Sequence, residues 1–392
     1  MRYYKIDITK ADGTPFLFKS LGIPLTSLLQ TGPQNPISGI ANPGALNVEF
    51  EIPFANLTDP SSNSSWLRIW GLGLQDIGNA ADLNGLSISI SAGMSRGLPL
   101  ANPAQAGLIM QGTIFQAYGN WINTDQTIDI NFFPAATPVK PAPSSPTSAP
   151  QSTASAPNQT SALSGAPNQN AGVSFSWKAS QPLSSAISNV LSIAMPGYTP
   201  VMEISEKLVQ NFDAPGVYQS LGQFADHINK LSRSIIGGSY RGVTMAVNGS
   251  TVRVFDGSVP TPAGGVKQIA FQDMIGQPTW QDDATISLKL VLRADINMGD
   301  VISIPPNQWT ISSGSAAFAQ QKNKSPDNSS SFSGNYKVTN GQYHGNFRQG
   351  DAASWNTTLQ LFPELLGTNT APSPSPMPYL GGGSAASSLG SA

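Results

Sequence analysis

The chain of 392 residues contains no cysteine and only two histidines, His227 and His344. The absence of cysteine excludes a disulfide framework, a thiolate zinc site and an iron–sulfur cluster. Two histidines so far apart in sequence also provide none of the H-x-H or H-E-x-x-H spacings that hold a catalytic metal. We therefore predict neither a metal site nor a cofactor.

Charged residues are scarce as well. Asp, Glu, Lys and Arg make up 11% of the chain, against about 25% in an ordinary soluble domain. The net charge is −2 and the 20 basic residues form no cluster, so specific nucleic-acid binding is not expected. A surface with few charges loses little hydration energy when a partner covers it. The composition favours a protein surrounded by other subunits, although a secreted, adhesin-like β protein would share it.

Long apolar runs are also missing. No stretch of about 18 apolar residues exists that could span a bilayer. The first residues, MRYYKID, alternate polar with apolar side chains and do not build the core of a signal peptide. We expect no membrane insertion, and synthesis and assembly in a cytoplasm.

Composition divides the chain into four parts. Residues 135–172 are almost entirely Pro, Ser, Ala, Thr, Gln and Asn, and residues 367–392 end in a Gly/Ser/Ala-rich stretch. Such segments bury too little apolar surface to offset the entropy of ordering them. We predict an extended or disordered linker at 135–172, a flexible tail at 367–392, and folded blocks at 1–134 and 173–366.

The first block has the pattern of an all-β domain. Four stretches alternate apolar with polar residues: Tyr4, Ile6 and Ile8; Val48, Phe50 and Ile52; Leu86, Ile88 and Ile90; Ile128, Ile130 and Phe132. A period of two is what a sheet with one buried face requires. Short strands between Gly, Pro and Asn turns predict a sandwich or a barrel.

The second block mixes helix with strand. Six apolar residues follow a helical period: Leu221, Phe224, Ala225, Ile228, Leu231 and Ile235. Ser220 and Gln223 form a capping-box pair before this face, and Gly237 ends it. A shorter helix is predicted from about Leu183 to Ala194.

Beyond these helices the period changes to two. Asn248-Gly249 predicts a hairpin with a type I′ turn between strands at 243–247 and 251–255. Further strands are predicted at 286–292, 301–304, 336–338 and 357–361, with a polar loop at 312–333. The expected fold class is mainly β (α+β), with one or two helices in the second block.

Possible catalytic motifs lack their structural context. Residues 93–97 (GMSRG) match the G-x-S-x-G elbow that exposes a nucleophilic serine, here Ser95, but no helical pattern follows. Asp282 and Asp283 are neighbours, which on a strand point to opposite faces and cannot flank one bond. His227 and His344 are expected to be packed or hydrogen-bonded residues. We predict that the chain is not an enzyme.

Several phrases in both blocks carry a resemblance. They are residues 106–112 (AGLIMQG), 210–216 (QNFDAPG), 273–280 (DMIGQPTW), 292–295 (LRAD), 343–348 (YHGNFR) and 354–357 (SWNT). In this order the phrases resemble the central baseplate hub proteins of contractile-tailed bacteriophages. The resemblance covers roughly 300 residues, and the Pro/Ser/Ala-rich linker departs from it.

The resemblance implies tube-like β-barrel domains and a trimer in the virion that joins the sixfold tail tube to a threefold spike. The implied partners are further copies of the chain, a tail tube or tube-adaptor protein, a spike protein, the tape measure protein and baseplate wedge proteins. Trp280, Trp309 and Phe347 are candidate interface residues, because aromatic side chains contribute disproportionately to interfaces. Ordinary core packing is their alternative.

Other functions remain open from the sequence. The chain could be a tube initiator, an adaptor or a wedge protein of the same tail. It could also be a carbohydrate- or receptor-binding β protein, which should show a shallow aromatic groove. A cell-wall hydrolase would depend on residues such as Ser95, His344 or Asp283.

Overall fold

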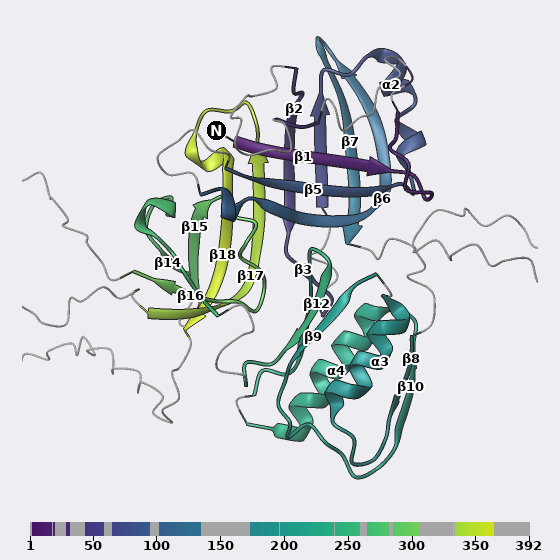
Figure 1. The fold of residues 1–392 in the computed structure, drawn as a ribbon, viewed down its shortest axis with the longest axis vertical. Coiled ribbons are helices and arrows are strands. Elements are labelled where there is room, and N and C mark those ends of the chain that lie inside the picture. Colours follow the sequence, from purple (N-terminus) through teal and green to yellow (C-terminus); the bar gives the residue numbers. More distant parts are fainter. Residues whose placement is uncertain are drawn as a thin grey trace, which may run out of the picture.

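The computed structural model describes residues 2–17, 19, 29–31, 44–58, 65–94, 102–134, 173–195, 197–238, 240–258, 265–281, 285–305, 332 and 334–363. The predicted linker at 135–172 and the predicted tail at 367–392 lie outside these residues. The described part forms two β-units and one α/β unit (Figure 1). The predicted fold class, mainly β with helices in the second block, is confirmed.

The first β-unit consists of six strands in the order β1-β5-β6-β7-β4-β2. They are β1 (Arg2–Thr9), β2 (Asn47–Pro53), β4 (Ser65–Trp70), β5 (Ser87–Met94), β6 (Gly107–Ile122) and β7 (Asp125–Pro134). β1 and β5 run across β2, so the sheet curls over its own apolar face (Figure 1). Tyr4, Ile6 and Ile8 are fully buried, as their alternation predicts. The strand predicted around Leu86 begins one residue later, at Ser87.

Short helical segments connect these strands. They are α2 (Leu74–Gly78), η2 (Ala80–Leu83) and η3 (Pro103–Gln105). The preceding glycines Gly71 and Gly73, which begin like a dinucleotide fingerprint, lead only into the five-residue α2. A helix this short does not provide the βαβ context of a dinucleotide site.

The second β-unit continues the same sheet. Its strands are β13 (Val266–Gln268), β14 (Thr279–Trp280), β15 (Ile286–Val291), β16 (Val301–Ile304), β17 (Gly334–Asn346) and β18 (Trp355–Pro363), with η4 (Phe271–Asp273) and η6 (Ala352–Ser354) between them. β17 pairs with β2 of the first unit, so twelve strands form one sheet. One hydrophobic core extends beneath both units.

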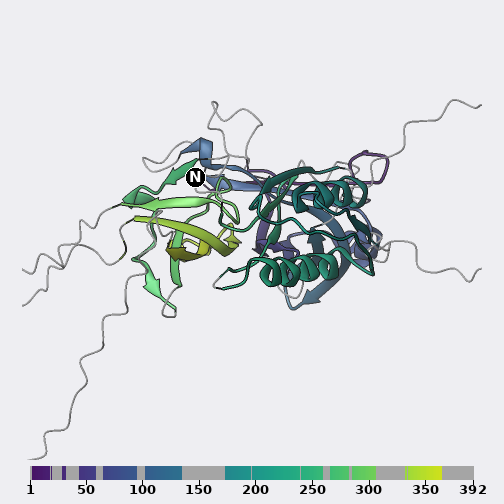
Figure 2. The same cartoon turned by 90° about the horizontal axis from the view of Figure 1, so that it is seen from below.

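The α/β unit has three layers (Figures 1 and 2). A four-stranded sheet contains β3 (Ala55–Asn56), β9 (Thr199–Glu203), β11 (Thr244–Asn248) and β12 (Thr251–Phe255). A two-stranded ribbon contains β8 (Val173–Trp177) and β10 (Ala214–Tyr218). The helices α3 (Leu183–Ala194) and α4 (Leu221–Ile236) contact strands of both sheets, and the unit has its own core.

Both predicted helices are confirmed. In α4, the Ser220 hydroxyl accepts from the Gln223 backbone N–H at 3.2 Å, and Gly237 takes φ +71° at the end. The reciprocal bond of a capping box differs, because the Gln223 side chain accepts from the N–H of Gln219 and not of Ser220. The cap therefore satisfies two free N–H groups of the first turn and its approach.

The predicted hairpin is confirmed but its turn is not of the predicted type. Asn248 pairs with Thr251, so Gly249 and Ser250 are the two central residues. Gly249 has φ +56°, and Ser250 is not among the residues with positive φ. A type I′ turn needs positive φ at both central positions, so the structure instead uses one glycine at the first.

Glycines make room for the seam between the two β-units. A Cβ at Gly345 of β17 would lie 2.3 Å from the Phe50 ring of β2, and one at Gly341 would lie 2.7 Å from Phe54. Phe50 is fully buried. The two strands can pair closely only because β17 has no side chain at these places.

The first prediction concerns this seam. Gly345→Ala forces a methyl group against Phe50, and we expect it to lower the free energy of unfolding by about 1–3 kcal/mol. Gly350→Ala is the control, because no atom lies within 4 Å of a Cβ there. Urea unfolding of both variants measures the difference. Equal stability of the two variants would contradict the packing at the seam.

Candidate interaction surfaces

The residues considered for catalysis do not come together. Ser95, Asp282 and Asp283 lie outside the described residues. His227 is exposed on α4 with its ring 5.1 Å from Tyr218, whereas His344 is partly buried on β17 of another unit. Within the described ranges, no group of three His, Asp or Glu residues could hold a metal ion. No helix in that part of the chain has the length and apolar character needed to cross a membrane.

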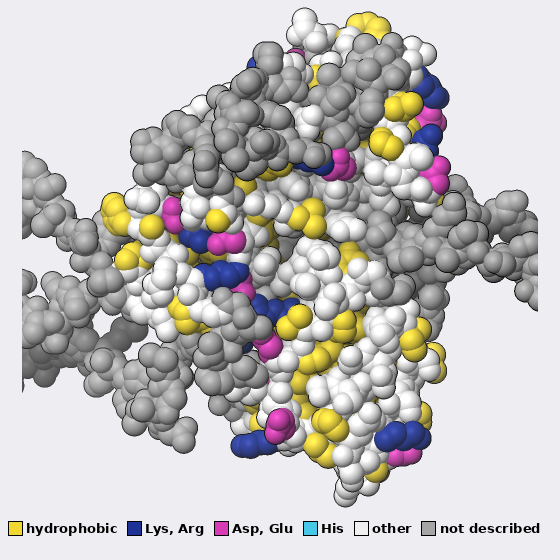
Figure 3. Space-filling model, viewed as in Figure 1, with side chains coloured by type: hydrophobic (Ala, Val, Ile, Leu, Met, Phe, Trp, Pro, Cys, Tyr) yellow, Lys and Arg dark blue, Asp and Glu magenta, His cyan; other side chains and the backbone are white. Residues whose placement is uncertain are grey.

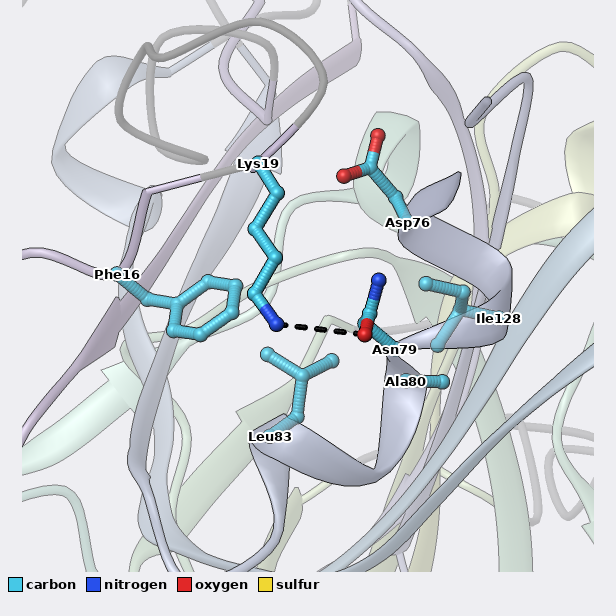
Figure 4. A pocket seen from close by; sticks show the side chains of 7 residues that line it. All are labelled: Phe16, Lys19, Asp76, Asn79, Ala80, Leu83 and Ile128. Atoms are coloured by element: carbon cyan, nitrogen blue, oxygen red, sulfur yellow. Dashed lines mark hydrogen bonds between the residues drawn. The ribbon is translucent and has the colours of Figure 1, made fainter. Parts of the chain in front are cut away.

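A small cavity lies beside α2 and η2 (Figure 4). Its lining residues are Phe16, Lys19, Asp76, Asn79, Ala80, Leu83 and Ile128. Lys19 closes one side by donating to Asn79 at 3.3 Å and to Asp82 at 2.6 Å. The cavity has room for about one water molecule, so it is too small for an organic ligand.

The predicted interface residues occupy different environments. Trp280 lies on the two-residue strand β14, 49% exposed, with its ring 5.7 Å from Phe332. Phe347 is partly buried and contacts Tyr4 at 5.0 Å and Trp355 at 6.4 Å between ring centroids. Trp309 lies outside the described residues. Trp280 therefore has exposed surface for a partner, while the ring contacts of Phe347 lie within the chain.

An aromatic surface that the sequence reasoning missed lies on the outer side of the first β-unit. Trp66, Arg68 and Trp70 alternate with the buried residues of β4. Arg68 lies over the rings of both tryptophans, 5.9 and 5.8 Å from their centroids. Cross-strand register places Asp129 and Tyr118 beside Arg68. We call these five residues the Trp–Arg face.

The polar groups of the Trp–Arg face are already paired. Arg68 donates to both carboxylate oxygens of Asp129, at 2.5 and 3.0 Å, and Asn120 donates to Asp129 at 2.7 Å. The hydrogen bond from Asp129 raises the pKa of the Arg68 guanidinium. Trp66 donates to Glu51 at 3.3 Å. The alternation in SWLRIW could have revealed this face, because three large residues share one side of the strand.

A buried ion network joins the α/β unit to the second β-unit. Arg253 of β12 donates to Glu203 of β9 at 2.7 Å and to Asp300, just before β16, at 2.6 Å. Lys267 of β13 approaches the other oxygen of Asp300 at 2.6 Å. Arg253, Glu203 and Asp300 are each less than a tenth exposed. Buried charges are tolerated when they are paired in this way.

A hydroxyl near this network responds to it. Tyr343 is buried and donates to the Ile296 carbonyl at 3.1 Å. Burial first, and then the charges of Asp295 and Asp300, raise the pKa of Tyr343. The hydroxyl therefore stays protonated and acts as a structural donor.

A second buried pair joins the two β-units. Arg293, after β15, donates to Asp273 of η4 at 2.8 Å and to Asp295 at 2.8 Å. Gln105 of η3 also donates to Asp273, at 3.2 Å. All three units are thus connected by charged groups withdrawn from water.

The second prediction tests the first network. Arg253→Met leaves Glu203 buried without its cation, and we expect a loss of about 3–5 kcal/mol in the free energy of unfolding. The control is Lys230→Met, because Lys230 and Asp226 form an exposed pair on α4, which is worth about 0.5 kcal/mol or less. Thermal and urea unfolding measure both. A loss as small as that of the control would show that the network does not hold the units together.

Comparisons with known proteins give structural neighbours only. No protein-family model matches the chain, and no curated protein matches it. A tail protein from Neisseria meningitidis MC58 has a TM-score of 0.45 and 8% identity over 93% of this chain and 97% of the other. The 43 kDa tail protein of prophage MuSo2 from Shewanella oneidensis has a TM-score of 0.45 and 7% identity, over 93% and 99%.

A further neighbour is larger than this chain. The Francisella PdpA-VgrG complex has a TM-score of 0.42 and 8% identity, and the match covers 95% of this chain and 59% of the other. A tail protein, a prophage tail protein and a VgrG complex are thus among the solved structures to which this chain is similar.

Proposed function

We propose that the chain is a non-enzymatic structural component of a contractile phage tail, the baseplate hub that joins the sixfold tail tube to a threefold spike. The observation that carries the proposal is the seam between β2 and β17, which sets two six-stranded β-units side by side in one chain. Three such chains arranged in a ring present six β-units in succession. This is the arrangement that the sequence phrases of the hub family imply.

The distribution of charge supports a structural role. The face in Figure 3 consists mostly of uncharged side chains, and its basic and acidic groups lie close to one another. Uncharged polar surface can be covered by neighbouring subunits at a small desolvation cost. A ring also requires heterologous contacts that close upon themselves, and such contacts need two different surfaces of this kind.

The partners follow from the same proposal. They are further copies of the chain, the tail tube or a tube-adaptor protein, the spike, the tape measure protein and the wedge proteins of the baseplate. The place of action is the virion, after assembly in the host cytoplasm. In this role the chain binds its neighbours and carries out no reaction, so Ser95→Ala and His344→Ala leave its function intact.

One alternative is a tube initiator, an adaptor or a wedge protein of the same tail, which differs in symmetry. Another is a carbohydrate-binding β protein. The Trp–Arg face is the aromatic surface such a protein would use, but Arg68 covers a face of both Trp66 and Trp70. Sugars stack on open ring faces, and the hub proposal therefore fits this surface better.

The third prediction is the copy number. Native mass spectrometry of the full chain at several concentrations should show a species of three times 41.0 kDa. Cryo-electron microscopy of the tail tip should place it on the tail axis. Six copies would favour a tube initiator. A chain that stays monomeric at every concentration and is absent from the axis would overturn the proposal.

A further inference from the structure

The two most exposed large apolar side chains of the described residues lie in the α/β unit. Ile193 near the end of α3 is 81% exposed and Val217 in β10 is 80% exposed. Phe212, in the loop before β10, is also largely exposed. Single exposed apolar residues are ordinary, so the surroundings of Ile193 and Val217 decide whether they matter.

The surroundings of Val217 are free of charge. Val217 pairs with Ser174, and Pro215 pairs with Ser176, and these four residues form the exposed outer face of the ribbon. We call them the ribbon face. Neither β8 nor β10 contains a charged residue. The nearest pair in sequence, Lys178 and Asp213, is self-satisfied at 3.0 Å.

The surroundings of Ile193 are equally neutral, and the neighbouring helix shows that this is not required by the fold. α3 contains no charged residue, and its exposed side carries Asn189, Ser192 and Ile193. α4 of the same unit carries Asp226, Lys230 and Arg233. A surface helix normally has charged residues on its outer side, as α4 does. We call the exposed end of α3 the α3 end.

We propose that the ribbon face of one copy of this chain docks on the α3 end of the next copy. The two surfaces match in character, because each is uncharged and each centres on one protruding aliphatic side chain. A charged partner would lose its hydration against either surface without gaining a counter-charge. The chain itself supplies a neutral partner for its own neutral surface.

The contact is heterologous, since it joins two different surfaces of the same unit. A heterologous contact with a suitable rotation closes into a ring, whereas a contact of one surface with itself gives a dimer. The ribbon is the outer layer of the α/β unit (Figure 1). This inference rests on the proposed hub function and names the surfaces through which its copies meet.

The fourth prediction is a charge-exchange experiment on the full chain. Val217→Glu or Ile193→Lys alone places an unpaired charge in the contact, so each should weaken self-association more than about tenfold. Combined in one chain, Val217→Glu and Ile193→Lys face one another across every contact and should restore association. Both positions are exposed, so neither variant should change the melting temperature appreciably.

The matched control is Ser234→Lys, which adds a lysine to the last turn of α4 just as Ile193→Lys does in α3. It should leave self-association unchanged. Native mass spectrometry and light scattering measure all four variants against the parent chain.

The outcomes separate this inference from the proposed function. A parent chain that does not self-associate refutes the hub proposal and this inference with it. A parent chain that forms trimers, with single variants that form them equally well, refutes only the ribbon contact. Weakening by Val217→Glu alone, or failure of the double variant to recover, likewise overturns the pairing of these two surfaces.

Discussion

The pairing of β2 with β17 is the interaction on which the rest of the structure depends. It joins strands almost 300 residues apart in sequence and makes one sheet of two β-units. Gly341 and Gly345 allow it, because Phe54 and Phe50 occupy the space that side chains would take. Burial of large aromatic rings at the seam provides its free energy.

Residues that follow β17 also complete the first β-unit. Trp355 of β18 donates to the Gly93 carbonyl of β5 at 2.9 Å and packs on Phe50 with ring centroids 5.3 Å apart. Arg2 of β1 lies over Trp355 and donates to the Asn346 carbonyl at 2.6 Å. The turn between β17 and β18 is therefore held by the first strand of the chain. The first and second blocks of the sequence are not independent in space.

Local elements could be predicted from the sequence because local physics determines them. The alternation around Ile6 and the cap at Ser220 each involve residues within one element, and both are confirmed. The pairing of β2 with β17 could not be predicted, because many apolar strands have the same alternation and none specifies its distant partner. The turn at Gly249 was assigned the wrong type because register across the hairpin, and not the Asn-Gly dipeptide, decides which residues are central.

The surfaces were harder to predict than the core for a related reason. Trp280 was singled out because it follows a turn-rich phrase, and it is half exposed. The Trp–Arg face was missed because its residues alternate with core residues inside a strand, where large aromatics are usually assigned to the core. Only the three-dimensional register shows that Arg68 meets Asp129 from a neighbouring strand.

A division of roles between charged and uncharged residues follows from these contacts. Arg253, Arg293 and their carboxylates lie inside, where a pair of fixed geometry makes each joint between units specific. The ribbon face and the α3 end have no charges at all, although water would accommodate charges there at no cost. A chain with few charged residues that places them at internal joints keeps its outer surfaces cheap to desolvate. Such a distribution suits a protein whose outer surfaces are covered after folding, since each unit must be rigid before its neighbours can pack against it.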